Sequence, residues 1–435
     1  MSFQKPKGTQ DLLPGTVEKW QYLEETARNL TALYRYQEVR TPIFEHTELF
    51  ERGVGETTDV VEKEMYTFED KGKRSVTLRP EGTAGTVRAY TENKLYADPD
   101  VNKLYYIGPM FRYERPQAGR MRQFHQFGIE AIGSTSPALD AEVITFGYEY
   151  CRKLGLTGVR VDVNSVGTPE IRASFREKLL AFLTPMRHEL CNDCQSRMDR
   201  NPLRVLDCKV DQHRFADAPS LLDELDEECR THFEQVLAYL DAMGVPYEVN
   251  PKLVRGLDYY THTAFEYKAA GIGAIDTIGG GGRYNGLVGQ IGGAEYDRPG
   301  VGLGLGLERI LLVLEAQGVA TPEYPPLDLY LIGLGERAEA ETVRLVHEAR
   351  SAGLTADKDY QGRKMKPAMK SADRLAAREV AILGDDELDA GEITIKTMAT
   401  GEQRKLPLGE FIRVLAEAKA KAANREQTEE GGQVQ

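Results

Sequence analysis

The sequence predicts an α+β protein: an antiparallel sheet flanked by helices, a helical insertion within that domain, and a small carboxyl-terminal α/β domain. Three observations lead to this prediction. Residues 104–111 and 123–132 alternate apolar and polar side chains on either side of a Pro/Gly turn, which is the pattern of an antiparallel hairpin. Strand patterns fade over residues 168–245, where helical periodicity replaces them. Beyond residue 326, strand and helix patterns alternate, as they do in α/β domains.

The amino-terminal segment opens with a predicted helix and a predicted strand. Apolar residues recur at steps of three and four across residues 16–34, and this spacing predicts an amphipathic helix. A strand that contains Pro42 is expected over residues 37–44. Together with the hairpin, these elements make residues 1–167 the first segment of the sheet domain.

The helical insertion and the second segment of the sheet domain follow. Residues 169–183 and 221–243 have helical periodicity, so residues 168–245 are interpreted as the insertion. Gly-rich, strand-like sequence then resumes, and residues 300–318 form a predicted strand that runs into an apolar-faced helix. Residues 246–321 are therefore expected to complete the sheet domain.

A Pro-rich segment, PEYPP at residues 322–326, marks the next boundary, because consecutive prolines end helices and stiffen linkers. We expect an α/β domain with a mostly parallel sheet over residues 327–419. Residues 420–435 are polar and charged, and are expected to form a disordered tail. The predicted strands of the α/β domain are residues 327–334, 354–357, 380–383 and 392–397, and its predicted helices are residues 338–352, 364–377 and 408–419.

Length, cysteine content and the amino terminus set the broad class. A chain of 435 residues can bury a large core without disulfides or metals. Its five cysteines are an odd and sparse set, which indicates reduced thiols and a cytoplasmic location. The first residues, MSFQKPKGTQ, have no apolar signal core. Charged residues interrupt the most apolar window, residues 300–314, so no membrane span is expected.

The cysteines also raise the question of a metal site. Cys191 and Cys194 have the spacing of metal ligands, whereas Cys208 and Cys229 lie far apart in sequence. We expect free thiols and no bound metal in this region. Structural zinc is the alternative that the spacing of the first pair leaves open.

The charge distribution is uneven along an acidic chain. The net charge is -13 and the sequence pI is about 5.3, but binding to nucleic acid depends on the local charge that meets the phosphates. Basic residues gather in the hairpin loop, residues 112–122, and again in residues 358–378. The two clusters predict a defined RNA-binding surface. For the second cluster, a solvated helix face is the alternative.

Two charged residues of the predicted hairpin indicate a ligand-binding site. Arg112 lies at the end of its first strand and Glu130 lies inside its second strand. A guanidinium group is permanently charged and binds phosphate oxygens in pairs, while a buried carboxylate suits a small hydrogen-donating ligand. Such a site would activate a polar small molecule with a nucleotide. The alternative is a basic surface hairpin with Glu130 in an ion pair.

Three segments resemble, in the right order, the motifs of class II aminoacyl-tRNA synthetases. Residues 16–44 resemble motif 1, the hairpin with Phe-Arg-Tyr-Glu at residues 111–114 resembles motif 2, and residues 300–318 resemble motif 3. Two further segments, LVRGLDYYTHTAFE and GGGGRYNGL, resemble the histidine-specific signatures of histidyl-tRNA synthetases. KGTQDLLP and LRPEGTAGTVRAY match the same family, so the resemblance covers about residues 5–415. Asn285 stands where that family more often has Asp.

The resemblance implies a histidine–tRNA ligase. It would form histidyl-adenylate from L-histidine and ATP, with Mg²⁺, and transfer histidine to the 3′-terminal ribose of tRNA(His). It implies a homodimer formed through motif 1 and a carboxyl-terminal domain that reads the anticodon. One alternative is a catalytically inactive, histidine-sensing regulatory subunit, and another is an RNA-binding module without activity. Such regulatory relatives generally lack the carboxyl-terminal domain, which argues against the first alternative.

The resemblance also implies roles for nucleotide-binding residues. Arg112 and Arg255 are the expected catalytic pair, on opposite sides of the α-phosphate. Arg309 and Phe124 are expected to enclose the adenine, and Arg120 to contact the outer phosphates. Arg255 lies among apolar neighbours, and the alternative for this residue is a buried ion pair with Asp258.

Histidine recognition requires an acceptor for one imidazole N–H and a partner for the other nitrogen. Glu130 is expected to be the acceptor and Tyr260 the partner, with Tyr259 as the alternative because adjacent strand residues face opposite ways. The expected ligands of the α-amino group are Glu81, Thr83 and Gln126. The expected tRNA contacts are Arg115 and Gln117 in the motif 2 loop and Arg363, Lys364 and Lys366 in the carboxyl-terminal domain.

Overall fold

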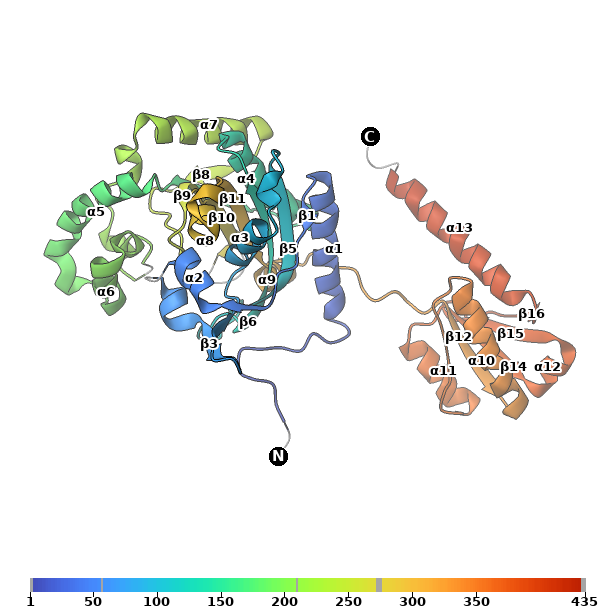
Figure 1. Cartoon of the computed structure of the whole chain (residues 1–435). Helices are drawn as coiled ribbons and strands as arrows, with labels where there is room; N and C mark the ends of the chain where they lie inside the picture. Colours follow the sequence, from blue (N-terminus) through green and yellow to red (C-terminus); the bar gives the residue numbers. More distant parts are fainter. Residues whose placement is uncertain (1–2, 56–57, 209, 271–275, 432–435) are drawn as a thin grey trace. The chain divides into compact units, whose positions relative to one another are not determined.

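The computed structural model describes residues 3–55, 58–208, 210–270 and 276–431. The chain divides into two compact units, Met1–Glu323 and Tyr324–Gln435, and each is drawn in Figure 1. The division falls inside the PEYPP segment, where prolines limit the backbone to extended conformations.

An 8-stranded sheet forms the centre of the first unit. The strands at its two edges pair in parallel, β1 with β5 and β7 with β8, and the strands between them are antiparallel. The predicted antiparallel sheet is therefore confirmed. In spatial order the strands are β1 (Gln37–Glu38), β5 (Asn102–Phe111), β6 (Gln123–Ile132), β11 (Gly300–Gly306), β10 (Thr277–Arg283), β9 (Thr261–Lys268), β7 (Arg160–Ser165) and β8 (Tyr247–Val249).

The register of the β5–β6 hairpin decides which residues share a face. Leu104 pairs with Glu130, and Glu130 pairs on its other side with Gly302 of β11. Because side chains alternate along a strand, the even-numbered residues of β6 face one side of the sheet. The odd-numbered residues, such as Phe127 and Ile129, are fully buried in the main core on the other side.

Helices cover the core face of the sheet. Each helix contributes apolar side chains to one cluster, which includes Trp20, Phe146, Val236 and Ile310. Burial of one large apolar side chain stabilises the folded state by about 1.5–3 kcal/mol. The helices of this face are α1 (Val17–Leu33), α4 (Pro137–Lys153), α7 (Glu227–Met243) and α9 (Leu307–Ala316). Three further helices pack on one another: α2 (Thr47–Val54), α3 (Thr83–Glu92) and α8 (Leu287–Gly292).

The strand expected over residues 37–44 is wrong as a single element. The chain forms β1 in the central sheet and then β2 (Phe44–His46) in a separate three-stranded sheet with the order β2-β4-β3. Pro42, between the two strands, cannot donate a ladder hydrogen bond, so it favours the break. The other two strands of the small sheet are β3 (Tyr66–Glu69) and β4 (Ser75–Leu78).

The insertion is helical and has its own apolar cluster. The helix predicted over residues 221–243 is interrupted, because Asp226 accepts a hydrogen bond from the Cys229 N–H at 2.8 Å and begins α7 after a short 3₁₀ helix, Leu221–Glu224. Phe175, Leu179 and Phe215 are fully buried within the insertion. Its other α-helices are α5 (Pro169–Leu183) and α6 (Asn192–Arg200).

The second unit has a five-stranded mixed sheet with the order β13-β12-β14-β15-β16. β12 pairs in parallel with β13 and β14, and the remaining two pairs are antiparallel, so the expectation of a mostly parallel sheet was wrong. Apolar clusters lie among its strands and helices. The strands are β12 (Leu329–Leu334), β13 (Ala356–Lys358), β14 (Glu379–Gly384), β15 (Glu392–Thr397) and β16 (Gln403–Pro407), and the helices are α10 (Glu336–Ser351), α11 (Met365–Arg374), α12 (Asp385–Ala390) and α13 (Phe411–Gly431).

Helix α13 corrects the prediction of a disordered tail. The helix continues from Phe411 to Gly431, so the backbone of residues 420–431 is helical, and residues 432–435 lie outside the described residues. The reason is composition: alanine, lysine, glutamate, glutamine and arginine are strong helix formers even where a polar sequence buries little surface. Polarity alone was therefore a poor guide to disorder.

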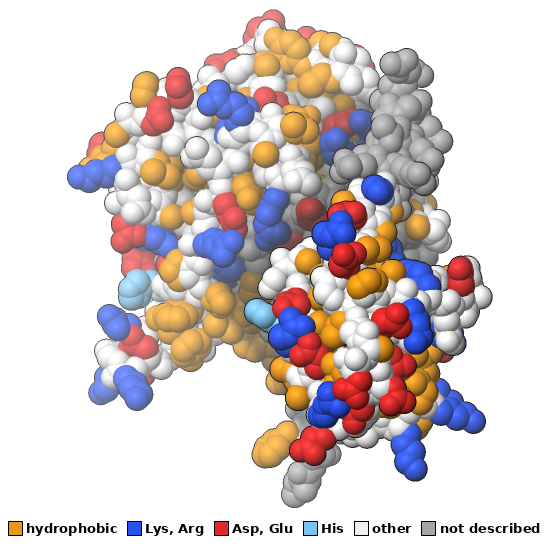
Figure 2. All heavy atoms as spheres, turned by 90° about the vertical axis from the view of Figure 1, so that its right-hand side faces the viewer, with side chains coloured by type: hydrophobic (Ala, Val, Ile, Leu, Met, Phe, Trp, Pro, Cys, Tyr) orange, Lys and Arg blue, Asp and Glu red, His pale blue; other side chains and the backbone are white. Residues whose placement is uncertain are grey.

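Figure 2 shows acidic and basic side chains interspersed over the face it presents. In the described part of the chain, no helix combines the length and apolar composition needed to cross a bilayer.

Candidate active site

A pocket of about 530 Å³ opens beside the central sheet, lined by residues of β5, β6, β9, β10 and β11 and by the start of α9. Glycines make the room for it. A Cβ at Gly280 would lie 2.7 Å from the guanidinium group of Arg255, and one at Gly282 would lie 2.7 Å from the ring of Tyr260. The glycine run at residues 279–282 thus permits the close packing of the pocket's functional side chains.

Four of the predicted site residues are arginines that line this pocket: Arg112, Arg120, Arg255 and Arg309. Arg112 Nε donates to the Pro80 carbonyl at 2.8 Å, and its guanidinium group lies 5.3 Å from the centre of the Phe124 ring. These contacts hold the cation against the wall that Phe124 forms. Arg120 forms an ion pair with Glu114 at 3.4 Å.

Arg309 connects helix α9 to the hairpin loop. Its Nε donates to the Gly119 carbonyl at 3.1 Å, and its Nη1 donates to the Thr277 carbonyl at 2.7 Å. Burial, Arg120 and Arg112 lower the pKa of Arg309, so the neighbouring cations repel one another. A bound polyanion would relieve this repulsion.

Arg255 is positioned by strand β9. Its Nη1 donates to Glu266 at 2.6 Å, and its guanidinium group lies 5.6 Å from the centre of the Tyr260 ring. Its Nε is buried without a hydrogen-bond partner among the described residues. Glu266 was not predicted from the sequence, and the signal that could have found it is its register partner Gly280 in the glycine run. Asp258, the partner considered from sequence, accepts from Asn201 at 2.9 Å.

Glu130 is fully buried and is not itself a lining residue of the pocket, although its three hydroxyl donors are. Its carboxylate accepts from the Thr83 hydroxyl at 2.7 Å and from the Tyr284 hydroxyl at 2.7 Å, with Tyr106 at 3.4 Å. Burial raises the pKa of Glu130 to about 8, although these donors lower it. Tyr106 and Tyr284 were missed by sequence reasoning, although Tyr284 belongs to the GGGGRYNGL segment that was singled out.

Residues expected to bind an α-amino group line the same pocket. Glu81 accepts from the backbone N–H groups of Thr83 and Ala84 at 2.7 and 2.8 Å, so it also holds the first turn of α3. Burial raises the pKa of Glu81. Gln126 of β6 lines the pocket beside these residues.

Tyr259 and Tyr260 both line the pocket, with ring centroids 4.6 Å apart. Both tyrosines, predicted from sequence to bind histidine, are therefore placed at the pocket. The two residues lie in the turn before β9, so the alternation of a strand does not apply to them.

The predicted tRNA-contacting residues are divided between the two units. Arg115 and Gln117 are exposed in the hairpin loop. In the second unit, Lys364 and Lys366 are exposed, whereas Arg363 donates to Asp359 at 3.2 Å and to Ser371 at 2.8 Å. In the same basic segment, Lys358 is buried and paired with Glu339. The segment is therefore only partly a free basic surface.

Comparison with known proteins decides the family. The model for histidyl-tRNA synthetase matches residues 8–310, and the model for an anticodon binding domain matches residues 328–418. The chain belongs to the histidyl-tRNA synthetase family. It is 58% identical over 422 residues to the histidine–tRNA ligase of Geobacillus sp. (strain WCH70), covering 96% of this chain and 99% of that protein.

Solved structures agree with the family assignment. The apo histidyl-tRNA synthetase of S. aureus is 44% identical, with a TM-score of 0.81 over 95% of this chain and 100% of that chain. A Bacillus halodurans protein described as an ATP phosphoribosyltransferase regulatory subunit/histidyl-tRNA synthetase shares the fold alone, at 20% identity and a TM-score of 0.64, over 88% of this chain and 98% of that chain. As a member of this family, the chain is a class II aminoacyl-tRNA synthetase, and the regulatory alternative is disfavoured.

Proposed function

We propose that the pocket carries out both steps of histidine–tRNA ligation: formation of histidyl-adenylate from L-histidine and ATP, and transfer of histidine to the 3′-terminal ribose of tRNA(His). One observation carries the proposal. Arg112 and Arg255, two permanent cations, line a pocket that is also lined by the two hydroxyl donors to the buried carboxylate of Glu130. Polyanion binding and recognition of a small hydrogen-donating ligand thus meet in one cavity.

The first step joins two anions that repel each other, and the arginines of the pocket can neutralise their charge. The carboxylate of histidine must approach the α-phosphate of ATP, and fixed cations offset their repulsion without reorganising during the reaction. Arg112 and Arg255 are proposed to hold the α-phosphate and the carboxylate. Phe124 and Arg309 are proposed to enclose the adenine, and Arg120 to contact the outer phosphates.

Magnesium is proposed to enter with the nucleotide. Glu64 and Glu114 both line the pocket, and burial and Glu114 raise the pKa of Glu64. A pair of neighbouring carboxylates at a pocket wall suits a divalent cation with oxygen ligands. They would hold Mg²⁺, which supplies neutralisation of phosphate charge when it is bound.

Glu130 and the tyrosines account for specificity. An imidazole N–H would donate to Glu130, and the hydroxyl of Tyr260 or Tyr259 would serve the other nitrogen. Such buried, paired groups reject amino acids that leave them without a partner. The α-amino group of histidine would be met by Glu81, Thr83 and Gln126.

The tRNA is proposed to contact both units. Arg115 and Gln117, exposed in the hairpin loop, would approach the acceptor end, and the anticodon-binding domain would use the exposed Lys364 and Lys366, with Arg363 in a smaller part because Asp359 occupies it. We further propose a homodimer formed through residues 16–44, acting in the cytoplasm.

The deciding experiment is ATP–pyrophosphate exchange run with each of the twenty amino acids. Exchange that depends on histidine alone is expected, and Arg112→Gln should abolish it. Arg413→Gln is the matched control, because Arg413 is an exposed arginine of α13 that pairs, among the described residues, with Glu410 and Glu417, both close to it in sequence. Exchange supported by a different amino acid, or none in the folded wild-type protein, would refute the proposal.

A further inference from the structure

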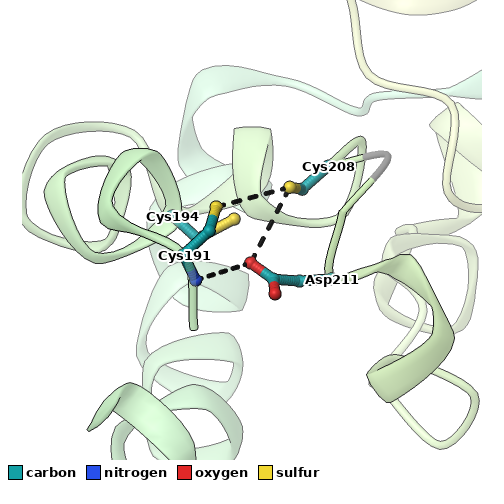
Figure 3. Close-up of side chains that lie close together, drawn as sticks. All are labelled: Cys191, Cys194, Cys208 and Asp211. Carbon is teal, nitrogen blue, oxygen red and sulfur yellow. Dashed lines mark hydrogen bonds between the residues drawn. The ribbon is translucent and has the colours of Figure 1, made fainter. Parts of the chain in front are cut away.

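Four potential metal ligands meet in the insertion, outside the catalytic pocket. The three sulfur atoms of Cys191, Cys194 and Cys208 and a carboxylate oxygen of Asp211 all lie within 4.8 Å of one another. Figure 3 shows the four side chains converging from α6 and from the segment that follows it. No step proposed for the ligase uses them.

The distances between the ligand atoms fit a tetrahedral ion. A Zn–S bond of about 2.3 Å places two sulfur ligands about 3.8 Å apart at the tetrahedral angle. The Cys191 and Cys208 sulfur atoms are 3.8 Å apart, and Cys208 Sγ is 3.8 Å from Asp211 Oδ2. A disulfide needs the sulfur atoms at about 2.0–2.1 Å, and all five cysteines are free thiols here.

We propose that Cys191, Cys194, Cys208 and Asp211 bind a structural Zn²⁺ ion. Thiolates are soft ligands that select zinc over the hard cations Mg²⁺ and Ca²⁺, and aspartate is a common oxygen ligand of zinc. The spacing of the cysteines had favoured free thiols, because Cys208 and Cys229 did not form a second pair. The fourth ligand is a carboxylate instead, and Cys229 lies elsewhere, 3.6 Å from His262 Nδ1.

Helix α6 and a backbone hydrogen bond hold ligand side chains of this site close together. Cys191 is the N-cap residue of α6 and Cys194 lies in its first turn, so one helix end presents two sulfur atoms. Asp211 Oδ2 accepts from the Cys191 N–H at 3.0 Å, which fixes the carboxylate beside them. Cys194, Cys208 and Asp211 are buried, and apolar residues of the insertion surround the thiols. A polar cluster buried among apolar groups is costly unless a partner satisfies it, and a metal ion would do so.

The ion would also stabilise one wall of the catalytic pocket. Arg197 of α6 and Arg204 of the 3₁₀ helix Pro202–Val205 both line that pocket, and both reach Asp59, at 3.1 and 3.6 Å. Cys194 lies in the same helix as Arg197, and Cys208 follows the 3₁₀ helix that carries Arg204. Zinc would therefore tie together the segments that carry Arg197 and Arg204.

The test measures zinc in the full-length protein, purified without a metal-binding tag and under reducing conditions. We expect about one zinc per chain, in keeping with a structural site that is filled on folding. After exchange of zinc for Co²⁺, a sulfur-to-cobalt charge-transfer band and intense tetrahedral d–d bands should appear. Cys208→Ser and Asp211→Asn should lower zinc content and thermal stability.

Cys151→Ser is the matched control, because Cys151 is a fully buried cysteine on α4, outside the cluster, and its replacement should leave the zinc content unchanged. If Cys208→Ser fails to fold, the wild-type measurement and Asp211→Asn still decide the matter. Wild-type protein that binds neither zinc nor cobalt after reduction, whether its thiols stay free or oxidise, would overturn the proposal. Metal content is measured independently of enzymatic activity, so the zinc proposal can fail while the proposed ligase function holds, and the reverse.

Discussion

Replacement of Glu130 by glutamine should remove a pH dependence from histidine binding. Glu130 is fully buried, accepts from Thr83 and Tyr284 at 2.7 Å each, and has a pKa of about 8. Glutamine keeps the size and one acceptor oxygen but cannot ionise. If the imidazole of histidine donates to Glu130, the carboxylate form is the one that binds.

The magnitude follows from the pKa. At pH 7 a carboxyl group with a pKa of about 8 is ionised in roughly one molecule in ten, which weakens apparent affinity about tenfold relative to the fully ionised form. Because the pKa is raised, wild-type affinity should rise with pH up to about 8 and then level off. A hydrogen bond to a charged acceptor exceeds a neutral one by roughly 1–1.5 kcal/mol. Glu130→Gln should thus bind histidine nearly as well as wild type at pH 7 and about tenfold more weakly at pH 9.

The assay is calorimetric titration of histidine, for wild type and Glu130→Gln, at several pH values from about 6.5 to about 9, on both sides of the pKa of Glu130. The ratio of the two affinities cancels titration of histidine itself. Wild type should also release a proton on binding at pH 7, seen in buffers of different ionisation enthalpy, and the variant should not. A ratio that stays constant across this range would show that Glu130 does not accept from the ligand as a carboxylate.

Three other outcomes are expected. Arg255→Ala should slow single-turnover adenylate formation by about 100- to 1,000-fold, the usual effect of losing one preorganised donor. Glu266→Gln, which keeps Arg255, should lower this rate less. A near-normal rate in folded Arg255→Ala would show that Arg255 has no catalytic role. A chain ending at Glu323, the boundary of the first unit, should retain histidine-dependent exchange if it stays folded and dimeric, but charge tRNA poorly; full-rate charging would contradict this. Glu130 holds its proton in the folded state up to about pH 8. The free energy of unfolding of wild type, compared with that of Glu130→Gln, should therefore fall by about 1.4 kcal/mol per pH unit between pH values of roughly 4.3 and 8. If urea unfolding shows the same pH dependence for both proteins over this range, the raised pKa of Glu130 is wrong.

Features encoded by local periodicity were predictable. The β5–β6 hairpin and helix α1 emerged within a few residues of their observed bounds, because alternation and 3.6-residue spacing are properties of neighbouring residues. Helix α13 shows the limit of that approach, since its composition favours a helix that polarity alone did not reveal. The strand at residues 37–44 failed because pairing with two different sheets, and not local pattern, decided where it broke.

The motifs of the sequence identified the family and assigned roles to four of the six arginines that line the pocket, but to only Glu81 among its six carboxylates. Their partners depend on how the chain folds. Tyr284 reaches Glu130 and Glu266 holds Arg255 because strand pairing brings distant segments to one face of the sheet. The same is true of Asp211, which completes the cysteine cluster although no spacing rule links it to Cys191 and Cys194. Sequence fixes which groups a strand or helix carries, whereas register and packing fix which of them meet, because those contacts join residues far apart along the chain.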